Sequence, residues 1–178
     1  MDHFDVENAL STFRVIVDTR EQNTPQARKR FKDIGVPIER HTMSYGDYCA
    51  NIDLPGGAAL YLPGEAIKPK LVIERKMSLD ELAACFTRGR ARFQREFERA
   101  AAAGARVILL VEDGNYEGIL FQRYHSRFTP QAYLASLTAW AIRYGMTPVF
   151  CKANTSGRLI REFLYRDMKE RLERGEYG

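Results

Sequence analysis

Several features that define other classes of protein are scarce or missing in this sequence. The longest strongly apolar run, Val107 to Val111, is far too short to cross a lipid bilayer. The three cysteines are widely spaced and form no CxxC pair, so neither a disulfide framework nor a structural zinc site is expected. The first residues, MDHFDVENAL, are acidic and have no apolar stretch, so we expect no signal peptide. These absences predict a cytoplasmic protein without a membrane partner.

The charge balance of the chain is mildly basic. There are 27 Lys and Arg residues against 23 Asp and Glu residues, which gives a formal net charge of +4 and a pI near 9.0. Such a balance permits a polyanionic partner such as DNA without requiring one. The length of 178 residues suits one compact domain. We therefore expect a single domain over residues 1–178, in which residues 1–12 form a loose lead-in.

Short apolar runs alternate along the chain with amphipathic segments. We predict extended segments at residues 13–17, 38–43, 48–52, 70–76, 107–111 and 147–150. We predict helices at residues 25–34, from Ser78 onward, and at 88–103, 131–144 and 157–174, with a hairpin or loop at 54–65. Strands that alternate with helices predict an α/β fold, with a central sheet covered by helices on both faces.

The segment KLVIERK places a carboxylate and an ammonium group on one side of a predicted strand. Side chains alternate between the two faces of a strand, so Glu74 and Lys76 point to the same side and Arg75 to the other. Asp47 follows Gly46 in the preceding extended segment and supplies a second carboxylate. A hard cation such as Mg²⁺ prefers oxygen ligands of this kind and activates water for attack on a phosphodiester. An Asp followed at a distance by Glu-x-Lys is the pattern of the PD-(D/E)xK nucleases, although this pattern alone also occurs by chance.

Further motifs accompany this pattern. They are VDTRE at residues 17–21, GDY at 46–48, ERKMSLD at 74–80 and GRARFQ at 89–94. In this order they resemble the VDxRE, GDY, ERKxxxD and GRxxxQ motifs of the XPF/Hef type of structure-specific endonuclease, from about Phe13 to the C-terminal helix. The resemblance implies a restriction-endonuclease-like fold, in which a mixed central sheet is flanked by helices on both faces. It also implies a Mg²⁺- or Mn²⁺-dependent endonuclease that cuts branched, flap or fork DNA in repair or recombination.

The patterns along the chain and the resemblance together assign roles to individual residues. The implied catalytic residues are Asp18, Asp47, Glu74, Lys76 and Asp80. The implied metal ligands are Asp18, Asp47, Glu74 and the carbonyl of Arg75. Lys76 would position or help to deprotonate the attacking water, and Asp80 would orient Lys76. The residues expected to contact DNA or to support the site from a second layer are Arg20, Glu21, Arg75, Arg88, Arg90, Arg92, Gln94 and Arg95.

Several of these residues also have a simpler structural explanation. Asp18 could cap the turn after the first strand, and Asp47 could be an ordinary turn residue. Ser78 and Glu81 frame a capping box around Asp80, where the helix dipole favours an acidic residue in the first turn. The structural and the catalytic interpretations of Asp80 can both hold.

The long helix predicted at residues 88–103 carries a basic stripe. Its members are Arg88, Arg92, Arg95 and Arg99. Such a stripe is most often only a solvated face, but beside a nuclease centre it could contact phosphates. Arg90 and Gln94 lie one turn apart and match the GRxxxQ motif, so they are candidates for DNA contact or for support of the site.

The last two predicted helices have strongly apolar faces. These faces are formed by Tyr133, Leu137, Trp140 and Tyr144 and by Leu159, Ile160, Phe163, Leu164 and Met168. Exposed apolar faces of this size mark interfaces, and the resemblance implies pairing through this region, so we expect a homodimer. The alternative is that both helices close the core of one monomer.

Relatives of the XPF/Hef type carry a helix-hairpin-helix domain after the nuclease domain, and residues 1–178 leave no room for one. We therefore expect DNA targeting to come from this domain or from a partner protein in trans, at the nucleoid of a prokaryotic or phage-infected cell. Two other functions stay open. A catalytically silent scaffold would bind DNA or a partner, although retention of every charged motif residue argues against it. A hydrolase of small phosphoesters would not need basic stripes.

Overall fold

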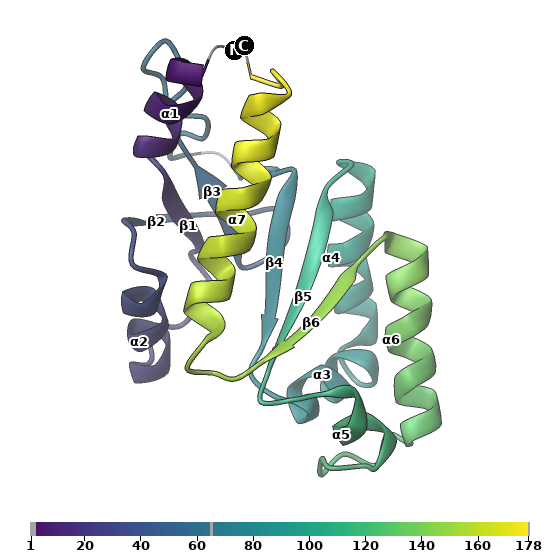
Figure 1. The fold of residues 1–178 in the computed structure, drawn as a ribbon. Coiled ribbons are helices and arrows are strands. Elements are labelled where there is room, and N and C mark those ends of the chain that lie inside the picture. The colour runs from purple at the N-terminus through teal and green to yellow at the C-terminus, as the bar shows by residue number, and fades with distance from the viewer. Residues whose placement is uncertain (1–2, 65, 178) are drawn as a thin grey trace.

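A computed structural model describes residues 3–64 and 66–177 (Figure 1). Its centre is a six-stranded mixed sheet in the order β2-β1-β3-β4-β5-β6. The strands are β1 (Arg14–Asp18), β2 (Ile38–His41), β3 (Tyr48–Asn51), β4 (Leu71–Lys76), β5 (Arg106–Glu112) and β6 (Thr147–Cys151). The helices are α1 (His3–Ser11), α2 (Pro25–Ile34), α3 (Leu79–Phe86), α4 (Arg90–Ala102), α5 (Tyr116–Leu120), α6 (Pro130–Tyr144) and α7 (Ser156–Glu173). The predicted α/β class with a mixed sheet is confirmed.

The strand directions decide which residues meet at one edge of the sheet. β1 pairs parallel to β2 and antiparallel to β3, and β3 pairs antiparallel to β4. β4, β5 and β6 are parallel to one another. The carboxyl ends of β1, β4, β5 and β6 therefore lie at the same edge as the amino end of β3. We call this edge, where the loops after β1, β4 and β5 begin, the functional edge.

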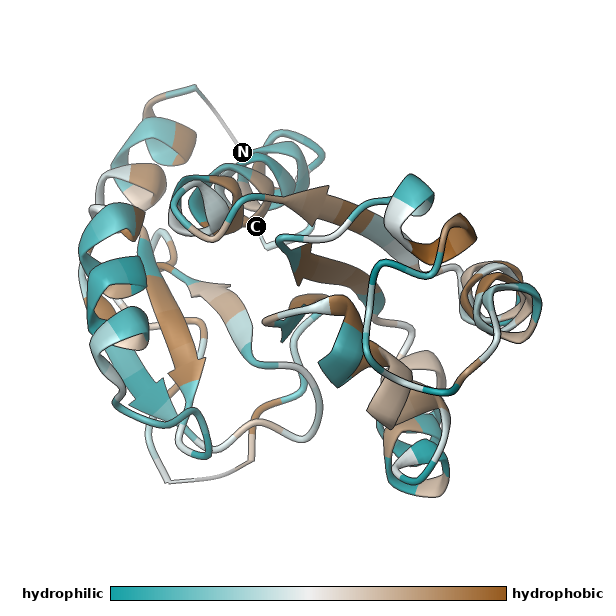
Figure 2. Ribbon diagram, turned by 90° about the horizontal axis from the view of Figure 1, so that it is seen from below, coloured by the Kyte–Doolittle hydropathy of each residue, from teal (hydrophilic) through white to brown (hydrophobic). Residues whose placement is uncertain are grey.

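Helices cover both faces of the sheet, because its central strands are apolar on both sides. Nearly every side chain of β4 and β5 is buried, as expected for parallel strands between two helical layers. α3, α4 and α6 pack on one face around Phe86, Phe93 and Trp140. α1, α2 and α7 cover the other face, where Ile160 and Leu164 are buried. Figure 2 shows strongly hydrophobic strands at the centre and largely hydrophilic helical surfaces outside.

Capping residues set the boundaries of several helices. Thr24 and Thr129 accept hydrogen bonds from backbone N–H groups in the first turns of α2 and α6, and each is followed by proline. Gly35 and Gly145 end the same helices in the left-handed conformation, with φ values of 71° and 61°. The predicted start of α2 at Pro25 and the predicted ends of α2 and α6 before Gly35 and Gly145 are therefore confirmed.

Two helices were not predicted. Residues 3–11 form α1 rather than a loose lead-in, and residues 1–2 lie outside the described part of the chain. Val6 and Ala9 are buried where α1 packs on α7, and so short a helix depends on this packing rather than on its own sequence. α5 forms after β5, where the side chain of Asn115 accepts a hydrogen bond from the backbone of Gly118 at 2.6 Å. Among the described residues, no helix combines the length and the apolar character needed to span a bilayer.

The extended segment predicted at residues 38–43 is shorter than expected. β2 ends at His41, and Met43 makes only an isolated bridge to Ile67. In the segment 54–65, an isolated antiparallel bridge between Asp53 and Ala59 encloses a turn at residues 55–56, which agrees with the predicted hairpin or loop as far as residue 64.

Most residues of the apolar helix faces that suggested a homodimer lie inside the monomer, and Tyr144, Leu159 and Phe163 are partly buried. Tyr133, Leu137 and Trp140 of α6 are each 0% exposed and pack in the aromatic cluster. On α7, the positions Ile160, Leu164 and Met168 are also buried against the sheet. The argument from exposed faces is therefore wrong, and the alternative in which both helices close the monomer core is confirmed. The homodimer itself stays a prediction.

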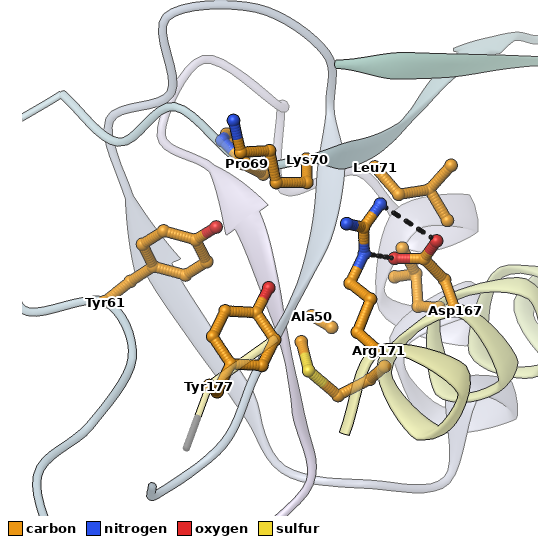
Figure 3. A pocket seen from close by; sticks show the side chains of 10 residues that line it. Ala50, Tyr61, Pro69, Lys70, Leu71, Asp167, Arg171 and Tyr177 are labelled. Carbon is orange, nitrogen blue, oxygen red and sulfur yellow. Dashed lines mark hydrogen bonds and ion pairs between the residues drawn. The ribbon is translucent and has the colours of Figure 1, made fainter. Parts of the chain in front are cut away.

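A small cavity lies at the opposite edge of the sheet (Figure 3). Its lining includes Tyr61 and Tyr177, together with Arg171, which pairs with Asp167 at 2.7 Å. This cavity forms where the end of α7 closes over β3 and β4. None of the residues predicted to be catalytic line it, so the site must be sought at the functional edge.

Candidate active site

Four residues of the predicted site meet at the functional edge. Asp18 is the last residue of β1, Asp47 precedes β3, and Glu74 and Lys76 lie at the end of β4. These three strands are neighbours. Backbone hydrogen bonds join them here, from Asp18 N to Asp47 O and from Asp47 N to Ile73 O, both at 2.9 Å. The fold thus brings together charged residues from three separate segments of the chain.

Glu74 and Lys76 form a buried ion pair. Both point to the same face of β4, as predicted, and are only 5% and 8% exposed. Lys76 Nζ lies 2.5 Å from Glu74 Oε1 and 5.0 Å from the centre of the Phe93 ring. Burial disfavours the ammonium, but Glu74 and Asp47 outweigh it and raise the pKa of Lys76. Lys76 therefore remains a cation, which suits it to orient water and stabilise negative charge rather than to accept a proton.

Gly46 allows Asp47 to approach β4. Its φ is 74°, and a Cβ atom at this position would lie 2.6 Å from the Cβ of Val72, so only glycine fits. Asp47 accepts a hydrogen bond from the backbone N–H of Arg75 at 2.8 Å. Burial, followed by the neighbouring Glu74 carboxylate, raises the pKa of Asp47 well above its ordinary value. A cation bound here would favour the charged carboxylate and reverse this shift.

Hydrogen bonds occupy both oxygens of the Asp18 carboxylate. Oδ1 accepts from the backbone N–H and the Nε of Arg20, at 2.8 and 2.6 Å, and Oδ2 accepts from the backbone N–H of Met43 at 2.7 Å. In this arrangement Asp18 positions Arg20 and the segment before β3. If Asp18 bound a metal, metal–oxygen bonds would have to replace some of these hydrogen bonds, so metal ligation by Asp18 stays a prediction. Metal ligation by the Arg75 carbonyl also stays a prediction.

Asp80 does not orient Lys76 in this structure, and that part of the prediction is wrong. The Asp80 carboxylate accepts hydrogen bonds from the backbone N–H groups of His125 and Ser126, at 2.7 and 3.0 Å, and lies 3.1 Å from His125 Nδ1. Burial opposes ionisation, but these hydrogen bonds prevail and lower the pKa of Asp80. The predicted helix cap is confirmed, because the Ser78 side chain accepts from a backbone N–H in the first turn of α3. Asp80 lies in that turn, beyond the strand that carries Lys76, and holds the loop after α5 instead.

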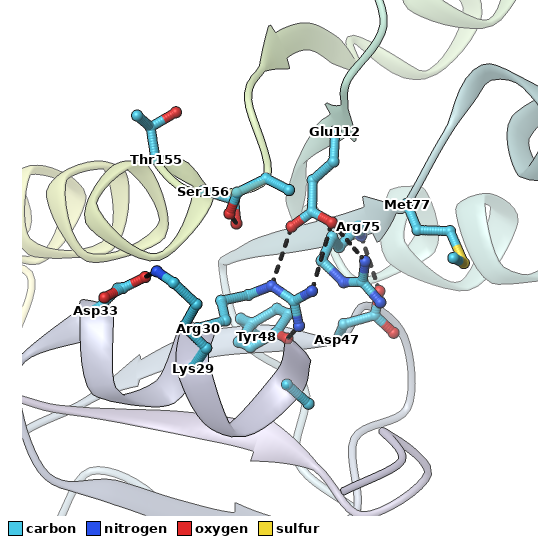
Figure 4. A network of polar contacts seen from close by, with 12 residues as sticks. Lys29, Arg30, Asp33, Asp47, Tyr48, Arg75, Met77, Glu112, Thr155 and Ser156 are labelled. Atoms are coloured by element: carbon cyan, nitrogen blue, oxygen red, sulfur yellow. Dashed lines mark hydrogen bonds and ion pairs between the residues drawn. The ribbon is translucent and has the colours of Figure 1, made fainter. Parts of the chain in front are cut away.

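A second group of charges lies on the opposite face of β4 (Figure 4). Arg75 points to this face, as the alternation of strand side chains predicted, and its Nη1 lies 3.0 Å from Glu112 Oε2. Arg30 reaches the same carboxylate, with 3.0 Å between its Nε and Glu112 Oε1. Glu21 accepts hydrogen bonds from both arginines and from the Tyr48 hydroxyl. This network joins α2, β4 and β5. It also fixes the position of Arg75, whose backbone N–H donates a hydrogen bond to Asp47.

Two members of this network, Arg30 and Glu112, were missed from the sequence. They are only 5% and 3% exposed. A signal existed for Glu112, which follows the apolar run VILLV and so ends a buried strand at the functional edge. Arg30 had no such signal, because it is one of several basic residues in PQARKRFKDI. Only the packing of α2 on the sheet distinguishes it from its neighbours.

α4 contributes another carboxylate that the sequence analysis missed. Glu96 lies one turn after Phe93, its side chain is 18% exposed, and its Oε1 is 3.7 Å from Arg20 Nη1. Burial, followed by Glu74, raises the pKa of Glu96. The three-residue spacing from Phe93, on the apolar face of the predicted helix, was the available signal. Glu96 adds negative charge to the site from the side of α4.

The residues predicted to contact DNA from α4 and its approach have different environments. All four arginines, Arg88, Arg90, Arg92 and Arg95, are exposed, and Gln94 is partly buried. Arg90 donates a hydrogen bond to the carbonyl of Phe86 at 3.3 Å, and its guanidinium lies 5.7 Å from the Trp140 ring. Gln94 donates to Glu98 at 2.8 Å on the helix surface. The Arg90 guanidinium therefore links α4 to α6 although it is exposed, whereas Arg88, Arg92 and Arg95 are accessible to a partner.

The donor set suits a single hard cation. Burial and then the neighbouring Glu74 carboxylate raise the pKa of Asp47, and a bound cation would favour the charged form of both carboxylates. Within residues 3–64 and 66–177, no group of three or more His, Cys, Asp or Glu side chains is arranged to hold a metal. Mg²⁺ is commonly bound by one or two carboxylates, with waters and substrate phosphates as its other ligands. The residues present fit an ion of that kind.

Comparison with known proteins identifies the family of this domain. A profile of the ERCC4 domain matches residues 17–163, a range that contains every residue of the site described above. The chain belongs to the ERCC4-domain family. A search among curated protein sequences finds no significant match to this ERCC4 domain.

Solved structures confirm the fold of this ERCC4 domain. XPF from Aeropyrum pernix superimposes with a TM-score of 0.58 and 21% sequence identity, over 85% of this chain and 64% of that one. XPF from Aeropyrum pernix in complex with DNA gives a TM-score of 0.59 and 22% identity, over 88% and 65% of the two chains. The ERCC4 domain thus spans just under two thirds of the length of these relatives. The XPF-type fold expected from the sequence motifs is confirmed.

Proposed function

We propose that this ERCC4 domain is a metal-dependent DNA endonuclease that hydrolyses phosphodiester bonds. The observation that carries the proposal is the buried Glu74–Lys76 ion pair beside Asp47 at the functional edge. A buried ion pair loses much of its Coulombic attraction to desolvation, so it is a poor device for stability alone. Its position next to a carboxylate with a raised pKa favours a catalytic role.

The residues of the site would divide the reaction between them. Asp47 and Glu74 would hold the divalent cation, Mg²⁺ or Mn²⁺. When bound, this ion supplies Lewis-acid activation of water and neutralises charge on the scissile phosphate. Lys76 would orient the attacking water and offset the charge that develops on the phosphoryl group. Arg20, held by Asp18 and 56% exposed in its side chain, would contact a neighbouring phosphate.

The substrate that we propose is branched DNA, such as a flap or fork, in repair or recombination. The membership of the family supports this, and one structural relative has been solved in complex with DNA. The exposed arginines at the start of α4 would contact phosphates rather than base edges, so binding would be sensitive to salt and weakly dependent on sequence. A 3′-hydroxyl and a 5′-phosphate are the products implied by the family.

We further propose a homodimer and a targeting protein in trans. Because the apolar face of α6 is buried, a dimer surface must lie elsewhere. β6 is the better candidate, since it is an edge strand whose residues Pro148 to Cys151 are only partly buried. A targeting protein would supply DNA-structure recognition that lies outside this domain.

A catalytically silent scaffold of the same fold is the second candidate function. The neighbouring carboxylates at the functional edge argue against a scaffold, because a protein that only binds DNA has no need to keep two like charges together. A hydrolase of small phosphoesters is less well supported, since it would have no need of the exposed arginines along α4.

A cleavage assay on a panel of DNA substrates tests the proposal. Labelled duplex, flap, fork and bubble DNA would be incubated with the protein in Mg²⁺, Mn²⁺ or EDTA. We expect cutting only with a metal, and cutting at least about a hundredfold slower for Glu74→Gln. Glu98→Gln is the matched control, because Glu98 is exposed on α4 and should leave the rate unchanged. Cutting in EDTA would rule out the metal mechanism, and DNA binding without cutting would favour the scaffold.

A further inference from the structure

The loop after α5 presents aromatic and basic side chains to solvent. Residues 121–128 read FQRYHSRF and contain no Asp or Glu. The exposed side chains of this loop are Phe121, Gln122, Arg123, His125 and Arg127. Phe121 is 69% exposed, and the Arg123 guanidinium lies 5.7 Å from its ring. Within the described part of the chain, neither Arg123 nor Arg127 forms an ion pair with an acidic side chain, so both positive charges are uncompensated.

The backbone of this loop is held firmly in place. Asp80 binds its middle through the N–H groups of His125 and Ser126. The Tyr124 ring is buried against Tyr133, and its hydroxyl donates to the carbonyl of Phe128 at 2.7 Å. The exposed side chains are therefore carried on an ordered frame, which lowers the entropy lost when they bind a partner.

The loop lies beside the functional edge. α5 follows β5, and Figure 1 shows it beyond the carboxyl ends of the strands, next to α3. Leu79 of α3 fills the space at Gly114 and Gly118, which precede the loop. Asp80, which anchors the loop, is in the first turn of the helix that begins directly after Lys76 and β4. The loop is thus attached to the same strand end that carries the ion pair.

We propose that this loop binds an unpaired stretch of DNA next to the cleavage site, with Phe121 stacked on a base. This inference rests on the proposed function and deepens it, because it assigns the recognition of a single strand to this domain itself. An exposed aromatic ring flanked by uncompensated guanidinium groups matches a nucleic-acid single strand, which offers a base face and a phosphate at short intervals. In a duplex the bases are stacked on each other and their faces are unavailable to Phe121. Asp80 is then a positioning residue for the loop.

Binding measured in EDTA, where no cleavage is expected, tests this inference. Fluorescence anisotropy would compare a short single-stranded oligonucleotide with the matching duplex. We expect Phe121→Ala to weaken single-strand binding by about 5-fold to 100-fold, the range for one stacked base, and duplex binding by less than about 2-fold. Phe121→Tyr keeps an aromatic ring, so it should bind the single strand about as tightly as the wild type does. Ile142→Ala is the matched control, because Ile142 is a large apolar residue on α6 that is 86% exposed.

A second measurement separates stacking from a general change in the loop. When 2-aminopurine replaces a base of the single strand, stacking on Phe121 should quench the fluorescence of the 2-aminopurine. This quenching should be absent with Phe121→Ala. Equal losses for single strand and duplex, or no loss, would overturn the inference. A wild-type protein that binds no single strand would also overturn it. Cleavage by the same preparations is scored separately, so the inference can fail while the nuclease proposal stands.

Discussion

Replacing Asp47 by Asn should make the metal-free protein more stable while removing its response to metal. The Asp47 side chain is partly buried beside the Glu74 carboxylate, and loss of hydration followed by this like charge raises its pKa. Asparagine has nearly the same shape and can still accept the hydrogen bond from the Arg75 backbone. The substitution therefore removes a like-charge repulsion without creating a cavity or leaving a donor unpaired.

The pH dependence of the effect follows from the raised pKa of Asp47. Single substitutions commonly change the free energy of unfolding by about 0.5–3 kcal/mol, and we expect an increase within that range at neutral pH. That is a rise of roughly 1–12 °C in melting temperature for a chain of this size. The pKa of Asp47 is higher in the folded protein than in the unfolded chain. The folded wild type is therefore most stable at a pH below the pKa that Asp47 has in the unfolded chain, where this carboxyl is protonated in both states. This stability is lost as the pH rises through the pKa that Asp47 has in the folded protein. The gain from asparagine should thus vanish at acidic pH and grow toward neutral pH.

Thermal unfolding in EDTA and in Mg²⁺ measures both parts of this prediction. Mg²⁺ should raise the melting temperature of the wild type but not the melting temperature of Asp47→Asn. At a Mg²⁺ concentration one hundred times the dissociation constant, the wild type should gain about 2.7 kcal/mol in the free energy of unfolding. Asp113→Asn is the control, because Asp113 is an exposed aspartate beyond the end of β5 and has a φ of 51°, which asparagine tolerates. If Asp47→Asn were less stable than the wild type in EDTA at neutral pH, the reasoning about this carboxylate would be wrong.

Three further predictions concern the charges around the site. Lys76→Ala should lower the free energy of unfolding, measured with urea, by about 3–5 kcal/mol, because it leaves the Glu74 carboxylate buried and unpaired. The double variant Lys76→Met with Glu74→Gln should recover most of this stability but none of the cleavage. Glu112→Ala should destabilise the fold by a similar amount, about 3–5 kcal/mol, because two guanidinium groups lose their carboxylate; an unchanged urea midpoint would contradict it. Charge reversal of Arg92 or Arg95 should weaken DNA binding and lower the slope of its salt dependence by about 1 each; unaltered slopes would leave these arginines as a solvated surface.

Much of the candidate site could be predicted because its chemistry is local in the sequence. The alternation of side chains along a strand placed Glu74 and Lys76 on one face and Arg75 on the other, and the structure confirms this. Gly46 marked a turn next to Asp47, where the φ of 74° favours glycine. Patterns of this kind depend on neighbouring residues, so a sequence determines them before any tertiary contact forms.

The tertiary structure decided the features that depend on which elements pack together. A strongly apolar helix face looks the same whether it covers a sheet or a partner chain, and only the packing of α6 showed that Trp140 belongs to the monomer core. The sequence offered Lys76 as the partner of Asp80, and only the position of the loop after α5 brought the backbone of His125 to it instead. Arg30 and Glu96 became part of the charge networks because α2 and α4 lie against the functional edge. The sequence by itself determined which side chains could do chemistry, while the partners of each charge were decided by long-range packing, since burial and Coulombic interactions depend on distance in space rather than along the chain.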